Sequence, residues 1–173
     1  MKVTEKDGVL SRWDDCHGVT SDQLRAGLTT RSCLDNTMSA AAGEHSLPSY
    51  VYKILSEEPP NPLPHALPLT PLDKQDGFIH LSAGWRVPQT AAQFFGSYRT
   101  IWLLRVDTNA ALAEEAQFRW GEDAGCMHMY ARDEGRWARL GAGVVVAVGK
   151  FEKEIGEEWE KVVARAVQDG WLA

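Results

Sequence analysis

Six of the eight prolines in this 173-residue chain lie between Ser56 and Leu72. Proline has a fixed φ and no backbone N–H, so this spacing excludes a helix or a central strand and favours an extended, polyproline-like conformation. Leucines interleave with these prolines, at Leu63, Leu67, Leu69 and Leu72, whereas flexible linkers are poor in leucine. We therefore expect the segment to pack against a folded domain, as a pocket wall or as a lid.

The composition is that of a globular protein, with 44% hydrophobic and 24% charged residues. A net charge of −6 and the lack of any cluster of Lys and Arg argue against a nucleic acid partner. No apolar run approaches the ~20 residues that span a bilayer, and no secretory signal is visible. Three cysteines without a CxxC pair fit reduced thiols, so we expect a cytoplasmic protein without a membrane partner. The sequence does not indicate an oligomeric state.

Hydrophobic periodicity predicts one globular domain over residues 49–173, preceded by a disordered extension over residues 1–48. Strands are expected at residues 50–55, 77–82, 100–106, 118–120, 127–131 and 144–151. Helices are expected at residues 87–95 and from about 152 to 168. Short turns between numerous strands favour an α+β fold, a mostly antiparallel sheet with two principal helices.

Two short strands carry the histidines that are candidates for chemistry. Alternation along a strand places His80 and Ser82 on one face and hydrophobic neighbours on the other, and a histidine beside a hydroxyl can bind an anion or exchange protons. In the second strand, His128 and Tyr130 share a face and offer a proton donor and a stacking ring. The alternatives are a partly buried strand histidine at 80 and an ordinary polar strand face at 128. No third ligand completes a metal site, so no metal is expected.

Charged and aromatic side chains near these strands are candidates for ligand binding. Arg119 offers a planar fork for phosphate or carboxylate, and Trp120 offers a flat apolar surface. Arg105 lies within the most hydrophobic strand and needs either an open cavity or an ion-pair partner, such as Asp107 or Asp76. Lys53, in the first strand, has the same two interpretations.

Several strings of this sequence resemble the family catalogued as domain of unknown function 952. The resemblance runs from about Tyr50 to Phe151 and is carried by YKIL, DGFIHLS, VPQTAAQFF, LLRVD, RW and HMY. It implies a fold similar to that of the ADP-ribosyltransferases, with a distant likeness to tRNA 2'-phosphotransferases. Those enzymes carry a histidine in their first strand, where this chain has Tyr52-Lys53-Ile54.

The resemblance implies a small enzyme that acts on NAD or a related phosphate-bearing small molecule, with NAD as substrate rather than as a bound cofactor. His80, His128 and Arg119 would be the catalytic residues. The ligand-binding residues would be Tyr52, Lys53, Ser82, Arg105, Trp120 and Tyr130. The missing first-strand histidine favours a non-catalytic nucleotide or small-ligand binding module instead. A cofactor-free isomerase or lyase of small-molecule metabolism is the further alternative.

Overall fold

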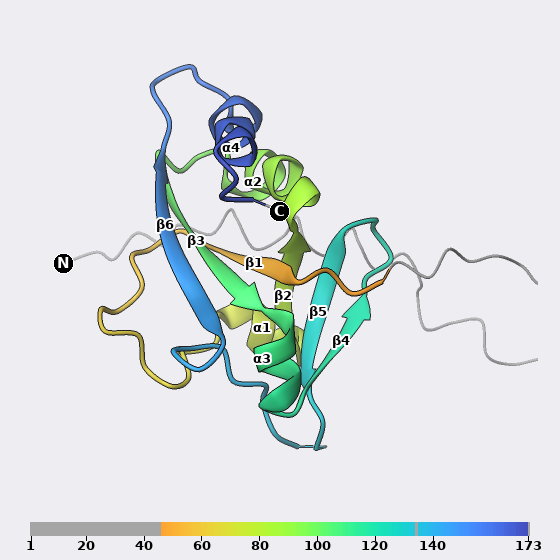
Figure 1. Cartoon of the computed structure of the whole chain (residues 1–173). Coiled ribbons are helices and arrows are strands. Elements are labelled where there is room, and N and C mark those ends of the chain that lie inside the picture. The colour runs from red at the N-terminus through yellow and green to blue at the C-terminus, as the bar shows by residue number, and fades with distance from the viewer. Residues whose placement is uncertain (1–45, 134, 173) are drawn as a thin grey trace, which may run out of the picture.

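The computed structural model describes residues 46–133 and 135–172, within which the chain forms a six-stranded antiparallel sheet and four α-helices (Figure 1). The strand order is β4-β5-β2-β1-β3-β6, which confirms the predicted α+β class. In chain order the elements are β1 (Tyr50–Leu55), α1 (Pro71–Asp76), β2 (Ile79–Ala83), a 3-10 turn (Gly84–Arg86), α2 (Val87–Phe95), β3 (Thr100–Asp107), α3 (Thr108–Ala113), β4 (Ala116–Trp120), β5 (Cys126–Ala131), β6 (Val145–Glu152) and α4 (Trp159–Gln168).

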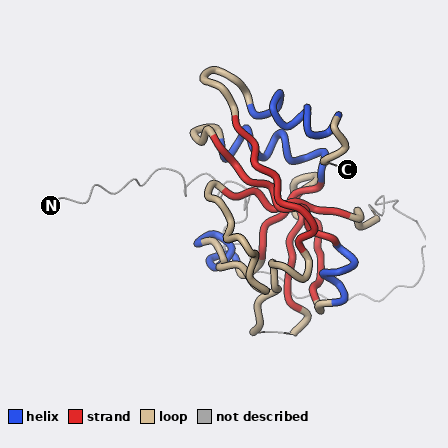
Figure 2. Tube along the Cα trace, turned by 60° about the vertical axis from the view of Figure 1, so that its left-hand side comes forward, coloured by secondary structure: helices blue, strands red, loops and turns tan. Residues whose placement is uncertain are grey.

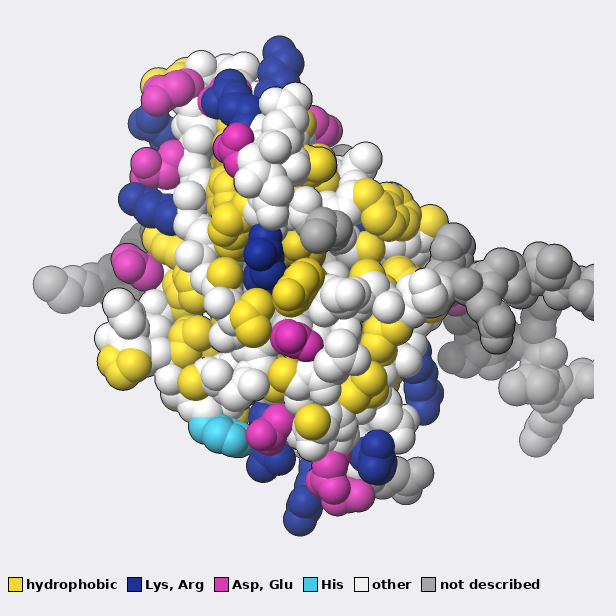
Figure 3. Space-filling model, in the orientation of Figure 1, with side chains coloured by type: hydrophobic (Ala, Val, Ile, Leu, Met, Phe, Trp, Pro, Cys, Tyr) yellow, Lys and Arg dark blue, Asp and Glu magenta, His cyan; other side chains and the backbone are white. Residues whose placement is uncertain are grey.

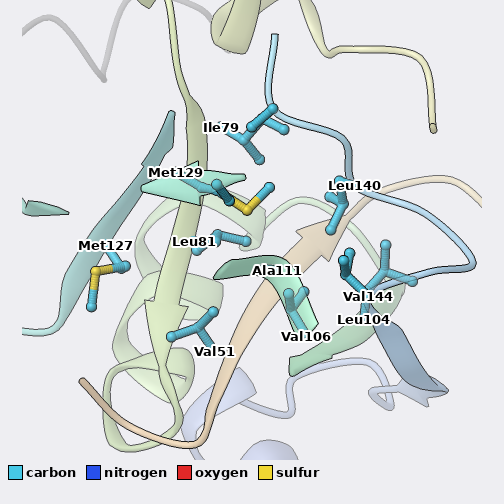
Figure 4. Packing of buried hydrophobic residues seen from close by; sticks show 12 residues of the cluster. Val51, Ile79, Leu81, Leu104, Val106, Ala111, Met127, Met129, Leu140 and Val144 are labelled. Atoms are coloured by element: carbon cyan, nitrogen blue, oxygen red, sulfur yellow. The ribbon is translucent and has the colours of Figure 1, made fainter. Parts of the chain in front are cut away.

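Each face of the sheet buries its own hydrophobic cluster, because side chains alternate between the two faces of every strand. One cluster joins the inward side chains of the central strands to α3 and to residues 138–144, and Figure 4 shows its packing. The other cluster joins the opposite face to α2 and α4, which contact each other at one end of the molecule (Figures 1 and 2). These two helices are the longest of the described residues and are the two that the sequence predicts.

Two helices were not expected from the sequence. Helix α1 begins inside the proline-rich segment, at Pro71, where a missing N–H is harmless because the first turn has no partner for it. Thr70 caps it by accepting a hydrogen bond from the backbone N–H of Asp73 at 3.1 Å. It ends at Gly77, whose φ of +82° is accessible to glycine without strain. Helix α3 follows β3 directly because Asp107 caps it through the N–H of Ala110.

The expected start of the last helix at residue 152 is wrong. Strand β6 pairs with β3 as far as Glu152, opposite Thr100, and α4 begins only at Trp159. The other predicted strands and α2 match the observed elements to within two residues at each end. The predicted extension over residues 1–48 lies outside the described residues, apart from its last three.

Figure 3 shows many hydrophobic side chains across the middle of one face, with single basic and acidic side chains among them and further charged side chains around its margin. Within the part of the chain that the structure describes, no helix is both long enough and apolar enough to cross a membrane.

Candidate functional site

A cavity of about 900 Å³ lies between the strands that carry the predicted histidines and residues 56–72, which we call the proline segment. The proline segment lines it as a wall. Two backbone hydrogen bonds attach the segment to the body of the protein, Leu67 N–H to Leu140 O at 2.7 Å and Ala142 N–H to Pro64 O at 2.9 Å. Gly141 permits this close approach, since a Cβ there would lie 2.2 Å from Pro64 O. We call the cavity the cleft.

The cleft is centred on a place where two neighbouring strands of the sheet separate. Strands β1 and β2 pair only at Val51–Ala83 and Tyr52–Ser82, and they diverge beyond these pairs. The N–H of Ala83 points toward β5 and bonds to Gly125 O. Because successive N–H groups alternate in direction along a strand, the N–H of His80 faces β1. That donor therefore needs a partner other than β1.

Asp73 of α1 occupies this gap and supplies the partner. Its carboxylate accepts the backbone N–H of His80 at 3.0 Å. It also accepts hydrogen bonds from Lys53 Nζ, which lies 2.8 Å from Oδ1 and 2.7 Å from Oδ2. Asp73 is 1% exposed and Lys53 is 6% exposed, so the pair forms a buried link between α1, β1 and β2. Of the two interpretations of Lys53, the structure therefore supports the ion pair, and Lys53 also lines the cleft.

The surroundings of Asp73 favour its ionised form. Burial by itself opposes ionisation, but the hydrogen bond from the His80 side chain and the charge of Lys53 outweigh it, so the pKa of Asp73 lies below its ordinary value. Burial lowers the pKa of Lys53, and Asp73 opposes that change. We therefore describe Asp73 as a carboxylate that accepts hydrogen bonds and donates none.

His80 lies between two carboxyl groups. Its Nδ1 is 2.9 Å from Asp73 Oδ1, and its Nε2 is 3.1 Å from Asp76 Oδ2. Because the Asp73 carboxylate only accepts, Nδ1 must carry the hydrogen of that bond. Nε2 is then the ring nitrogen that exchanges its proton on the cleft side, with Asp76 as its neighbour. This is the arrangement of an oriented acid–base histidine.

Aromatic rings form the wall next to His80. The Phe78 ring stacks on His128 with centroids 3.9 Å apart, and it lies 4.6 Å from His80 and 5.2 Å from Tyr130. The two histidine rings are 5.6 Å apart, because His80 and His128 are direct partners in the β2–β5 pairing. The guanidinium of Arg119 lies over the Tyr130 ring at 4.9 Å.

The predicted site residues divide into those that line the cleft and those that do not. The lining includes Tyr52, Lys53, His80, Ser82, Trp120, His128 and Tyr130. Arg119 is exposed at the outer side of Tyr130 and does not itself line the cleft. Ser82 is buried, and its hydroxyl donates to Thr90 at 3.4 Å. Cys126 also lines the cleft, and burial raises the pKa of its thiol although nearby Arg86 opposes this.

Arg105 lies apart from the cleft. Its guanidinium donates to the carbonyl oxygens of Gly170 and Trp171 and packs on the rings of Tyr50 and Trp171. The predicted ion pair with Asp107 or Asp76 is wrong, because Asp107 caps α3 and Asp76 contacts His80. Arg105 therefore holds the C-terminal residues against the sheet and does not reach a ligand in the cleft.

Sequence reasoning missed Asp73 altogether and named Asp76 only as a possible ion-pair partner of Arg105. Both belong to the short helix α1, which was hidden by the neighbouring prolines. The available signal was Thr70-Pro71 followed by an acidic residue at position 73, a pattern typical of a capped helix start. Within residues 46–133 and 135–172, no three His, Cys, Asp or Glu side chains are grouped so that they could hold a metal ion.

The fold and site define an α+β protein with one wall of its cleft made of histidines and aromatic rings. The family model described as "Protein of unknown function (DUF952)" matches residues 64–148 of the chain. The matched range includes Asp73, Asp76, His80 and His128. It excludes Lys53 and α4.

Two solved structures are similar to this chain. One is protein CC0527 from Caulobacter crescentus, at 24% identity, covering 61% of this chain and 88% of that chain with a TM-score of 0.46. The other is a double mutant of the same protein, at 23% identity with the same coverage and a TM-score of 0.45. No curated protein matches the chain.

Proposed function

We propose that the protein is an enzyme that binds a small organic molecule in the cleft and transfers a proton to or from it through His80. The observation that carries this proposal is the contact of Asp73 with both the backbone and Nδ1 of His80. An imidazole whose Nδ1 is fixed by a buried carboxylate presents Nε2 in one orientation, and orientation is the main requirement for proton transfer. The cavity volume of about 900 Å³ suits a small molecule.

The chemistry assigned to this arrangement needs no bound metal or redox group. His80 Nε2 removes a proton from one atom of the ligand and then gives it back to another atom of the same ligand, so the ring ends each turnover as it began. The Asp76 carboxylate, at 3.1 Å from Nε2, stabilises the positive charge on the ring between these two transfers. This sequence of steps conserves protons and electrons, and it is the chemistry of an isomerase or lyase.

ADP-ribosyl transfer from NAD, with an ADP-ribosyltransferase-like fold, is a second candidate. The acidic side chains that line the cleft favour it, because carboxylates stabilise the positive charge that develops on the ribose as nicotinamide leaves. The cleft offers few positively charged partners for the pyrophosphate group of NAD. Lys53 is the sole Lys or Arg among the described lining residues and is bound to Asp73, so Arg119 would have to reach the phosphates from outside.

The test is a panel of small metabolites that includes NAD and ADP-ribose, with binding followed by calorimetry and conversion followed by mass spectrometry. We expect the wild-type protein to convert at least one compound, and His80→Gln to slow that conversion by about 10²-fold or more. His65→Gln serves as the matched control, since His65 is exposed and does not line the cleft.

Three outcomes separate the candidate functions. Conversion that is unchanged in His80→Gln would contradict the proposal. Release of nicotinamide from NAD would favour ADP-ribosyl transfer. Binding without conversion of any compound would favour the non-catalytic module.

A further inference from the structure

Asp76 is the carboxyl group of the site that remains available to a ligand. It is the last residue of α1, it lines the cleft, and its side chain is 15% exposed. One oxygen, Oδ2, contacts His80 Nε2 at 3.1 Å. Within the described residues, the other oxygen, Oδ1, has no protein partner. An ionised carboxylate can accept about four hydrogen bonds, so Asp76 can accept further ones from a ligand in the cleft.

The charges around the cleft determine which donors suit it. The lining carries six acidic residues, Glu57, Glu58, Asp73, Asp76, Glu122 and Asp123. The one Lys or Arg among the described lining residues is Lys53, and both oxygens of Asp73 engage its ammonium group. A cleft lined mainly by one sign of charge concentrates ligands of the opposite sign. An anionic ligand would meet carboxylates and no uncommitted lysine or arginine in this lining.

The neighbouring wall determines the shape of the ligand. Phe78, His128 and Tyr130 contribute flat rings to the cleft next to His80. Flat rings pack well against planar groups, and aromatic faces attract cations. Planarity and positive charge are therefore favoured by two different parts of the same cavity.

We propose that Asp76 is a specificity-determining residue and that the ligand presents a cationic N–H group on a planar body, such as an amidinium, to its carboxylate. A planar N–H cation and a carboxylate form parallel, charge-assisted hydrogen bonds. The inference rests on the proposed function in one respect, that the cleft is the ligand site, and it adds the chemical class of the ligand.

The experiment uses three planar probes of nearly equal size that differ in charge: benzamidine, benzamide and benzoate. Their binding to the full chain is measured by calorimetry at neutral pH and located by the NMR signals of His80. We expect benzamidine to bind about tenfold or more tightly than benzamide, since only benzamidine forms charge-assisted hydrogen bonds with the carboxylate, and benzoate to bind most weakly. Asp76→Asn should remove most of the preference for benzamidine. Glu160→Gln, which makes the same change of charge on the exposed side of α4, should retain it.

Three results would overturn the inference. Benzoate could bind as tightly as benzamidine, the preference could persist unchanged in Asp76→Asn, or all three probes could fail to bind at millimolar concentration. The comparison of probes on the wild-type protein decides the question even if Asp76→Asn does not fold. Because this test measures binding, it is separate from the conversion of a substrate, whose failure would contradict the proposed function alone.

Discussion

Strand β1 has two neighbours in the sheet, and it is joined to them in different ways. Toward β3 it pairs continuously at six residue positions, from Tyr50–Asp107 to Leu55–Trp102. Toward β2 it pairs at two positions only. Beyond them the backbone N–H of His80 donates to the Asp73 carboxylate of α1 instead of to β1. Most side chains of the closed seam with β3 are apolar. The open seam with β2 is bridged by the Lys53–Asp73 ion pair and by the contacts of Asp73 with His80. The comparison teaches that the sheet gives up regular pairing where Asp73 binds and orients His80.

The two seams also depend on different forces. Leu103 and Leu104 of the closed seam are completely buried, and their contribution comes from burial of apolar surface. In the open seam, Lys53 and Asp73 are desolvated and stabilise the fold only while each has the other as a partner. Removing a single member is therefore expected to harm the open seam more than removing both.

The largest effect is expected from Asp73→Ala. This substitution leaves the Lys53 ammonium group and the His80 backbone N–H buried without their acceptor, and we expect it to lower the free energy of unfolding by about 3–5 kcal/mol. Urea denaturation measures the change. The double substitution Lys53→Met/Asp73→Leu should recover part of that loss, because no unpaired charge remains. A double variant no more stable than Asp73→Ala would contradict the assignment of the loss to the stranded charge.

A comparable but somewhat smaller effect is expected in the closed seam. Leu103→Ala creates a cavity in the cluster under α2 and α4 and should cost about 3 kcal/mol. Leu103 does not line the cleft, so the ring signals of His80 should keep their positions in this variant, whereas Asp73→Ala should shift them. A Leu103→Ala variant with displaced His80 signals would show that the two seams are not independent.

A smaller effect, in the response to acid, sharpens the comparison. The pKa of Asp73 is lowered by the fold, so its stabilising contribution is complete above its unfolded value of about 3.9 and is lost as the pH falls through the lower folded value. The stability difference between wild type and Asp73→Asn should therefore shrink between about pH 5 and about pH 2. The difference between wild type and Leu103→Ala should stay constant over the same range. Urea titrations at several pH values check both, and a constant Asp73→Asn difference would contradict the lowered pKa.

The sequence predicted the regular parts of the molecule and one half of the site. Alternation of apolar residues located the strands, and it correctly placed His128 and Tyr130 on one face, where both line the cleft. The meeting of His80 with His128 is a consequence of strand register, which the single sequence did not reveal. Asp73 was missed, and Asp76 was assigned to Arg105 instead of His80, because proline content masked the start of α1.

The proximity of Arg105 to the C-terminal residues was also beyond sequence reasoning. A charged residue within an apolar strand indicates that its side chain has a partner. When that partner is a backbone carbonyl group, the sequence cannot identify it, because every residue has one. Gly170 and Trp171, which supply these carbonyls, lie 65 and 66 residues away from Arg105. Only the tertiary structure brings them together, and it thereby moves Arg105 out of the candidate site.

The most direct test of the central claim, that Asp73 orients His80 through Nδ1, is the ¹⁵N NMR spectrum of the His80 ring. The account predicts a hydrogen on Nδ1 in the wild-type protein throughout the neutral pH range, and the loss of that state in Asp73→Asn. A neutral ring that carries its hydrogen on Nε2, with Nδ1 unprotonated, would contradict it.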